Sequence, residues 1–114
     1  MHELSIVFDI LDQIEEIAKE NHASEIKSLT LEIGEVSMVV PSYLEDCFKW
    51  ACKKKEVTKN CKLKIEIIKA ITICTNCNRT YDTLTFAKIC PYCGSDKTYL
   101  LKGNEFNIKE IEVI

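Results

Sequence analysis

The sequence predicts an α+β fold, in which two helices pack on a three-stranded sheet and a four-cysteine metal ribbon is inserted into that sheet. Two stretches carry apolar residues at helical spacing, and three others alternate as half-buried strands do. Two Cys-x-x-Cys pairs lie between the second and third strand stretches. We therefore expect residues 1–70 and 104–114 to form an α/β body and residues 71–103 to form a separate ribbon module.

The first predicted helix runs from Leu4 to Lys19, because its apolar residues recur every three or four positions. The stripe consists of Leu4, Val7, Leu11, Ile14 and Ala18. Asn21 and His22 suit the end of this helix, where a histidine meets the negative end of the helix dipole. His22 is thus not predicted to be a metal ligand.

The first predicted strand covers Ile26 to Val36 and alternates with a period of two. Leu29, Leu31 and Ile33 should face the core, and the polar residues Ser28, Thr30 and Glu32 should face the other way. Gly34 is expected to end the strand or mark a bulge.

The second predicted helix begins at Pro41, a residue that suits the first helical position. Its apolar face should consist of Leu44, Cys47, Phe48 and Ala51, widened by Tyr43 and Trp50. Lys53, Lys54 and Lys55 are expected to close the last turn, where cations favour the dipole, and not to form a binding patch.

Two further strands complete the predicted body. The stretch from Cys61 to Ile68 alternates as a half-buried strand, and Gly103 with Asn104 forms a turn before a last strand that starts at Phe106. The apolar residues change parity along this last strand, which predicts a bulge near Lys109 or Glu110.

The composition excludes several function classes. The formal net charge is −3, and four thiolates with one divalent ion would make it more negative, so we expect neither nucleic-acid nor membrane binding. The N-terminus lacks the pattern of a signal peptide, which favours a reducing cytoplasm. Of the seven cysteines, Cys47, Cys52 and Cys61 lie outside the paired motifs and are predicted to be small buried hydrophobic residues.

The paired cysteines predict a closed four-thiolate metal site. Its ligands are Cys74, Cys77, Cys90 and Cys93, and twelve residues separate the two pairs. Asn78 and Gly94, which directly follow the pairs, are the residue types that most readily adopt a positive φ and turn backbone N–H groups toward sulfur. A closed site has no open position for water, so a structural role is expected.

The ribbon by itself leaves alternatives open. Zinc and iron both accept four thiolates, so a rubredoxin-like electron carrier is one alternative. A zinc-ribbon adaptor that binds nucleic acid or protein is another, although the charges of the ribbon cancel once the loaded site is included. No catalytic triad, phosphate loop or paired-carboxylate motif is evident, so no enzyme activity is predicted.

The first residues, Met1-His2-Glu3-Leu4-Ser5, contain a second candidate metal site. A terminal amine, the following amide nitrogens and an early imidazole can form a square-planar site for Ni(II) or Cu(II). Histidine is too bulky a second residue for efficient removal of Met1, so the amine would be that of Met1.

Four stretches together resemble the HypA/HybF family of hydrogenase-maturation nickel metallochaperones. They are Met1-His2-Glu3-Leu4-Ser5, Glu32-Ile33-Gly34-Glu35, the two cysteine pairs and Gly103-Asn104-Glu105-Phe106. The resemblance runs from end to end and implies that Met1, His2 and Glu3 form the nickel site. It also implies that the four ribbon cysteines hold structural Zn(II).

The resemblance further implies a function and its partners. The protein would carry Ni(II) as transferred cargo to the large subunit of [NiFe]-hydrogenase, working with a nickel-binding GTPase. Some relatives also serve urease, which implies a urease accessory protein as a further partner.

Overall fold

The computed structural model describes residues 3–114, which divide into two compact units. The first, which we call the body unit, comprises Met1–Glu32, Val39–Glu66 and Asn107–Ile114, of which residues from Glu3 onward are described. The second, which we call the ribbon unit, comprises Ile33–Met38 and Ile67–Phe106.

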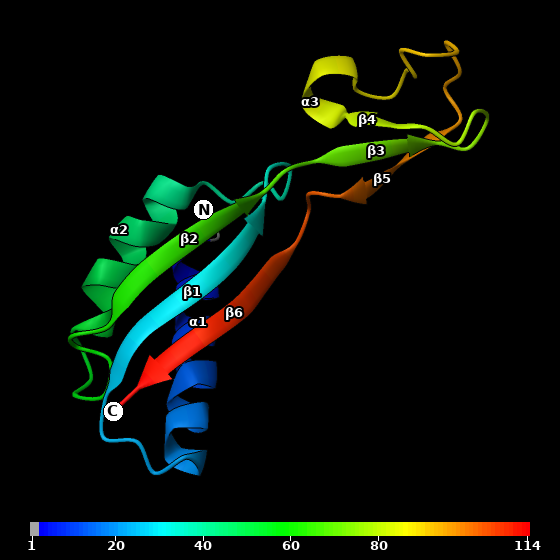
Figure 1. Cartoon of the computed structure of the whole chain (residues 1–114). Helices are drawn as coiled ribbons and strands as arrows, with labels where there is room; N and C mark the ends of the chain where they lie inside the picture. The colour runs from blue at the N-terminus through cyan, green and yellow to red at the C-terminus, as the bar shows by residue number, and fades with distance from the viewer. Residues whose placement is uncertain (1–2) are drawn as a thin grey trace. The chain divides into compact units, whose positions relative to one another are not determined.

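The body unit is built on a three-stranded sheet with the order β2-β1-β6 (Figure 1). The strands are β1 (Ile26–Gly34), β2 (Lys62–Ile68) and β6 (Phe106–Val113), and the helices are α1 (Glu3–Glu20) and α2 (Pro41–Cys52). The two helices pack against each other and against the sheet. The predicted α+β fold and both predicted helices are therefore confirmed.

The core of the body unit forms where the apolar stripes of the helices meet the central strand. Its fully buried large aliphatic side chains come from α1, α2 and β1, and include Val7, Ile14, Leu29, Leu31 and Leu44. Each belongs to a face predicted from periodicity, and burying a side chain of this size stabilises the fold by about 1.5–3 kcal/mol.

The predicted width of the α2 face was wrong. Tyr43 and Trp50 are exposed, with 54% of Trp50 accessible to solvent, so neither belongs to the buried face of α2. Trp50 instead lies edge-on to the ring of Phe8, at 6.3 Å between centroids, and Lys54 Nζ lies 4.1 Å above the same indole. Trp50 thus contacts one aromatic ring and one cation at the surface while more than half of it stays exposed.

The three cysteines outside the pairs are not equally buried. Cys52 and Cys61 are buried, as predicted, whereas Cys47 is only partly buried. Cys47 therefore lies at the margin of the apolar face of α2.

The lysine run also differs from its prediction. The helix ends at Cys52, so Lys53 is its C-cap and the next two lysines follow the helix instead of closing its last turn. Lys55 Nζ forms an ion pair with Glu15 at 2.6 Å, which links the segment after α2 to α1.

The polar face predicted for β1 is only partly open to solvent. Ser28 and Thr30 are buried, although both were expected to point away from the core. Ser28 donates a hydrogen bond to the carboxylate of Glu112 on β6, which satisfies the buried hydroxyl.

The ribbon unit contains a second three-stranded sheet, with the order β4-β3-β5. Its antiparallel strands are β3 (Ile71–Cys74), β4 (Thr80–Asp82) and β5 (Thr98–Lys102). A short helix, α3 (Thr83–Phe86), follows β4 and was not predicted. β3 begins directly after β2 and delivers Cys74 at its last position.

Two glycines allow very close backbone approaches within the ribbon unit. A Cβ on Gly34 would lie 2.0 Å from the carbonyl oxygen of Gly103, and Gly103 itself has a φ of +121°. The N–H of Gly34 donates to the carbonyl of Glu105 at 2.8 Å, and the N–H of Val36 donates to that of Gly103 at 2.8 Å. Gly34 therefore does end β1, as predicted, and the reason is contact with the 103–105 turn.

No helix within residues 3–114 is both long and apolar enough to span a lipid bilayer.

Candidate metal centre

The two cysteine pairs lie in turns of matching backbone geometry. In the first, the N–H of Asn78 donates to the carbonyl of Cys74 at 2.8 Å, and the N–H of Cys74 donates to the carbonyl of Arg79 at 2.9 Å. Asn78 has a φ of +60°. This hydrogen-bonded turn directs both thiols of the first pair to the same side of the hairpin between β3 and β4.

The second pair repeats this pattern. The N–H of Gly94 donates to the carbonyl of Cys90 at 2.9 Å, and the N–H of Cys90 donates to the carbonyl of Ser95 at 3.0 Å. Gly94 has a φ of +75°. The positive φ predicted at Asn78 and Gly94 is therefore confirmed at both positions.

The four thiols converge on one point. The sulfurs of Cys74, Cys77, Cys90 and Cys93 all lie within 4.8 Å of one another. The Sγ atoms of Cys74 and Cys93 are 3.6 Å apart, and so are those of Cys77 and Cys90. Zn–S bonds of about 2.3 Å in a tetrahedron place sulfurs about 3.8 Å apart, so this arrangement fits a zinc ion.

Hydrogen bonds, desolvation and neighbouring thiols give Cys77 and Cys93 different pKa values. The side-chain amide of Asn76 donates to Cys93 Sγ at 3.5 Å and, with the N–H of Ser95, lowers the pKa of Cys93 to about 6. The N–H of Arg79 favours the thiolate of Cys77, but desolvation and the three neighbouring thiols outweigh it and raise that pKa to about 11. A divalent cation bound by the four sulfurs would stabilise all four thiolates together and so offset the unfavourable effect of the neighbouring thiols on Cys77.

Little apolar packing supports the cysteines. The buried cluster at the site consists of Cys74, Tyr81 and Cys90, with Cys77 packed against it. Tyr81 lies edge-on to Phe86 at 6.0 Å, and its hydroxyl donates to the carbonyl of Ala87 at 2.9 Å. The metal is therefore expected to supply most of the cohesion of this end of the ribbon unit.

The N-terminal candidates are described only in part. Met1 and His2 lie outside the described residues. Glu3 is the first residue of α1 and is buried within the body unit. A carboxylate in the first turn of a helix interacts favourably with the dipole, which is a sufficient structural reason for an acidic residue there.

Sequence reasoning missed Asn76 as a ligand-supporting residue. Asn76 lies between the cysteines of the first pair, while its partner Cys93 is seventeen positions away in the chain. The signal available was an amide side chain inside a Cys-x-x-Cys turn, but only the folded site identifies the sulfur that accepts its hydrogen bond.

Comparisons with known proteins agree over the whole chain. Residues 1–113 match the family model described as HypA, hydrogenase/urease nickel incorporation, metallochaperone. The chain is 33% identical over 112 residues to hydrogenase maturation factor HybF of Klebsiella pneumoniae, covering 98% of both chains. It is 34% identical over 113 residues to hydrogenase maturation factor HypA of Actinobacillus succinogenes, covering 99% of both.

Solved structures give the same result. The solution structure of the Ni metallochaperone HypA from Helicobacter pylori is similar with a TM-score of 0.72 and 28% identity, over 100% of this chain and 98% of that one. A second solution structure of a HypA protein gives a TM-score of 0.77 at 28% identity, over 100% and 97% of the two chains.

Proposed function

This chain belongs to the HypA family of hydrogenase and urease nickel-incorporation metallochaperones, and we propose that it binds Ni(II) at its first residues and delivers it during [NiFe]-hydrogenase maturation. The observation that carries the proposal is the extent of the family match, residues 1–113, which includes both Met1-His2-Glu3 and the four ribbon cysteines.

In this proposal the ribbon cysteines hold Zn(II) as a structural ion. Four thiolates saturate a tetrahedral zinc ion, so no coordination position remains for water or for a transferred metal. The sulfur separations of 3.6 Å and the sparse apolar packing around Cys74 and Cys90 support this role.

The cargo site consists of the Met1 amine, the His2 imidazole and neighbouring backbone nitrogens, with Glu3 beside it. Nitrogen-rich planar ligand sets suit Ni(II). Glu3 begins α1, so these nitrogens directly precede a helix start, and its carboxylate offsets the positive end of the dipole near a bound cation. The amine and imidazole bind only when deprotonated, so nickel affinity should fall as pH falls.

We further propose that the protein works by binding and release, without catalytic turnover, in the cytoplasm. Its partners would be a nickel-binding GTPase and the large subunit of [NiFe]-hydrogenase, with a urease accessory protein where urease is served. The family description, which joins hydrogenase and urease nickel incorporation, supports both destinations.

Calorimetric nickel titration of the untagged chain tests the cargo site. His2→Ala should abolish stoichiometric nickel binding while zinc content stays at one ion per chain. His22→Ala is the matched control, because His22 is the other of the two histidines and lies beyond the end of α1. Unchanged nickel binding by His2→Ala, or equal loss in both variants, would refute the assignment.

A single residue added before Met1 gives an independent test. It preserves His2 and every side chain but moves the terminal amine away from the imidazole. Nickel binding should be lost as in His2→Ala. Retention of full affinity by the extended chain would show that the amine is not a ligand.

A further inference from the structure

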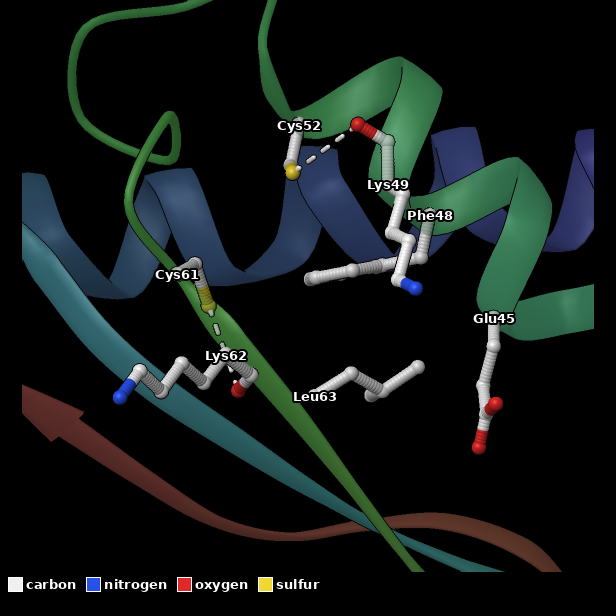
Figure 2. Close-up of a pocket in the computed structure, with 7 residues that line it drawn as sticks. All are labelled: Glu45, Phe48, Lys49, Cys52, Cys61, Lys62 and Leu63. Carbon is white, nitrogen blue, oxygen red and sulfur yellow. Dashed lines mark hydrogen bonds between the residues drawn. The ribbon is translucent and has the colours of Figure 1, made fainter.

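An edge strand of the body sheet borders an open groove. β2 lies at one edge of the β2-β1-β6 sheet, so within residues 3–114 one of its two long sides has no neighbouring strand. A cavity of about 420 Å³ lies between this strand and α2, and we call it the α2–β2 groove (Figure 2). An edge strand presents unpaired backbone N–H and C=O groups, with which a further strand can pair.

The apolar side chains of β2 are less covered than those of the central strand. Leu63 and Ile65 of β2 are only half-buried, whereas Leu29 and Leu31 of β1 are 0% exposed. Leu63 lines the α2–β2 groove together with Phe48 of α2. An apolar side chain placed in this groove would therefore remove from water surface that the chain itself leaves partly open.

Two charged side chains of α2 also line the groove, namely Glu45 and Lys49. They stand four positions apart in the order that favours an ion pair on a helix surface. Within residues 3–114, however, neither side chain forms an ion pair with any group. Figure 2 shows both extending from the side of α2 that faces Leu63. The groove thus presents one anion and one cation, each free to pair with an incoming group.

We propose that the α2–β2 groove binds an extended segment of a partner protein, which adds to β2 as a fourth strand. On its face toward α2, this segment carries an apolar residue at Phe48, an acidic residue at Lys49 and a basic residue at Glu45. Backbone hydrogen bonds to β2 supply affinity, and the side chains at alternate positions supply specificity.

The spacing of the two charges fits alternate positions of a strand. Residues four apart on a helix have Cβ atoms about 5–6 Å apart. Residues two apart on a strand share a face and lie about 6.7 Å apart. The acidic and basic residues of the segment are therefore two positions apart, opposite Lys49 and Glu45 respectively.

The charges of the groove also exclude a segment of uniform charge. Such a segment would place a like charge against either Glu45 or Lys49, which disfavours binding. Lys62 lines the groove as well, but Figure 2 shows its ammonium group directed away from these two side chains. The groove is thus matched to a segment that carries both signs.

Fluorescence anisotropy with a labelled peptide tests the proposal on zinc-loaded protein. The probe is a capped seven-residue peptide with valine, glutamate and lysine at positions two, four and six and threonine elsewhere. It is made in both sequence orders, because a strand can add parallel or antiparallel. One of the two peptides should bind with one site per chain. Absence of saturable binding by both, up to about 1 mM, would overturn the proposal.

Charge reversal identifies the groove as the binding site. Lys49→Glu and Glu45→Lys should each weaken binding about tenfold or more, because each opposes like charges. Lys53→Glu is the matched control, because Lys53 is the C-cap of α2 and is absent from the groove lining. The double variant Glu45→Lys/Lys49→Glu should prefer a peptide with glutamate and lysine exchanged. Equal loss in Lys53→Glu, or an unchanged peptide preference in the double variant, would contradict the assignment.

Hydrogen exchange measured by NMR on the unmodified chain tests strand addition itself. Bound peptide should slow exchange of amides in β2, and a peptide N-methylated along one backbone edge should bind more weakly. Slowed exchange in β6, the other edge strand, would place the peptide elsewhere. Amide shifts in β2 that depend on protein concentration would instead indicate that a second copy occupies this edge. His2→Ala should bind the peptide equally, so failure of the nickel assignment leaves this result unaffected.

Discussion

The body unit and the ribbon unit are stabilised by different means. The body unit buries large aliphatic side chains from two helices and a central strand, among them Ile14, Leu31 and Leu44. At the metal end of the ribbon unit, the buried cluster consists of two cysteines and Tyr81. One unit therefore depends on hydrophobic burial, and we expect the other to depend on a metal ion held by its four cysteines.

Under the proposed function, this difference would let one small chain hold one metal ion and transfer another. A transferred ion must leave its site, whereas a structural ion must stay. In the proposed function the cargo ligands directly precede α1 in the sequence, so nickel would exchange without loss of the fold. Zinc held by four thiolates on matched turns would be part of the ribbon itself.

Metal removal should give the largest effect and should act on one unit only. Stripping zinc with a chelator is expected to unfold the metal end of the ribbon unit, since structural zinc contributes about 10–16 kcal/mol at pH 7. Amide resonances of residues near Cys74 and Cys90 should collapse, while those of α1 and β1 persist in a two-dimensional NMR spectrum. Loss of the body resonances as well would mean that the two units do not differ in this way.

A core substitution should show the opposite pattern. Leu31→Ala removes a fully buried side chain from β1 and should cost about 2–5 kcal/mol in the free energy of unfolding of the body unit. Zinc affinity should not change. The control is Leu101→Ala in the ribbon unit, where the side chain is 51% exposed and the expected change is within about 0.5 kcal/mol. Comparable destabilisation by both variants in urea titrations would contradict the assignment of the core.

Gly34→Ala should destabilise the chain through the backbone contact between β1 and the 103–105 turn. A methyl group 2.0 Å from the carbonyl oxygen of Gly103 forces the backbone to move, at a cost of about 1–3 kcal/mol. Gly94→Asn is the control, because Gly94 has open space around it and Asn78 already occupies the equivalent turn. Thermal unfolding should separate the two variants, and equal melting temperatures would rule out the close-contact explanation.

The smallest expected effect is electrostatic and belongs to the sheet of the body unit. Hydrogen bonds from Ser28 and then Lys64 lower the pKa of Glu112. This stabilisation is present above the unfolded-state pKa of about 4.3 and is lost as pH falls through the lower folded-state value. Ser28→Ala and Lys64→Met should each raise the Glu112 pKa in an NMR titration, because each removes a group that favours the carboxylate. An unchanged Glu112 pKa in Ser28→Ala would show that the serine hydroxyl does not contribute to the lowered value.

Periodicity and spacing predicted the parts of the molecule that depend on local sequence. Patterns within a few residues predicted the helical stripes that contain Val7 and Leu44 and the buried alternation of Leu29 and Leu31. Such patterns also predicted the turn at Asn78. Each reflects a repeat of the regular backbone or the φ preference of one residue type.

Features that depend on tertiary contacts were not predicted. Trp50 was predicted to widen the buried face of α2, yet it is exposed. Periodicity indicates the direction in which a buried face points, but it does not indicate how wide that face is. The contact of Asn76 with Cys93 and the shared cavity of Cys52 and Cys61 both join distant chain segments. Only the folded chain brings such pairs together.

Parallel counting of nickel and zinc in two variants tests the separation of the two sites most directly. The untagged chain, His2→Ala and Cys74→Ser would each be saturated with both ions, desalted and analysed for metal content. We predict that His2→Ala retains one zinc and loses nickel, while Cys74→Ser loses zinc and retains nickel on a folded body unit. Loss of both ions from either folded variant would contradict the separation of the two sites.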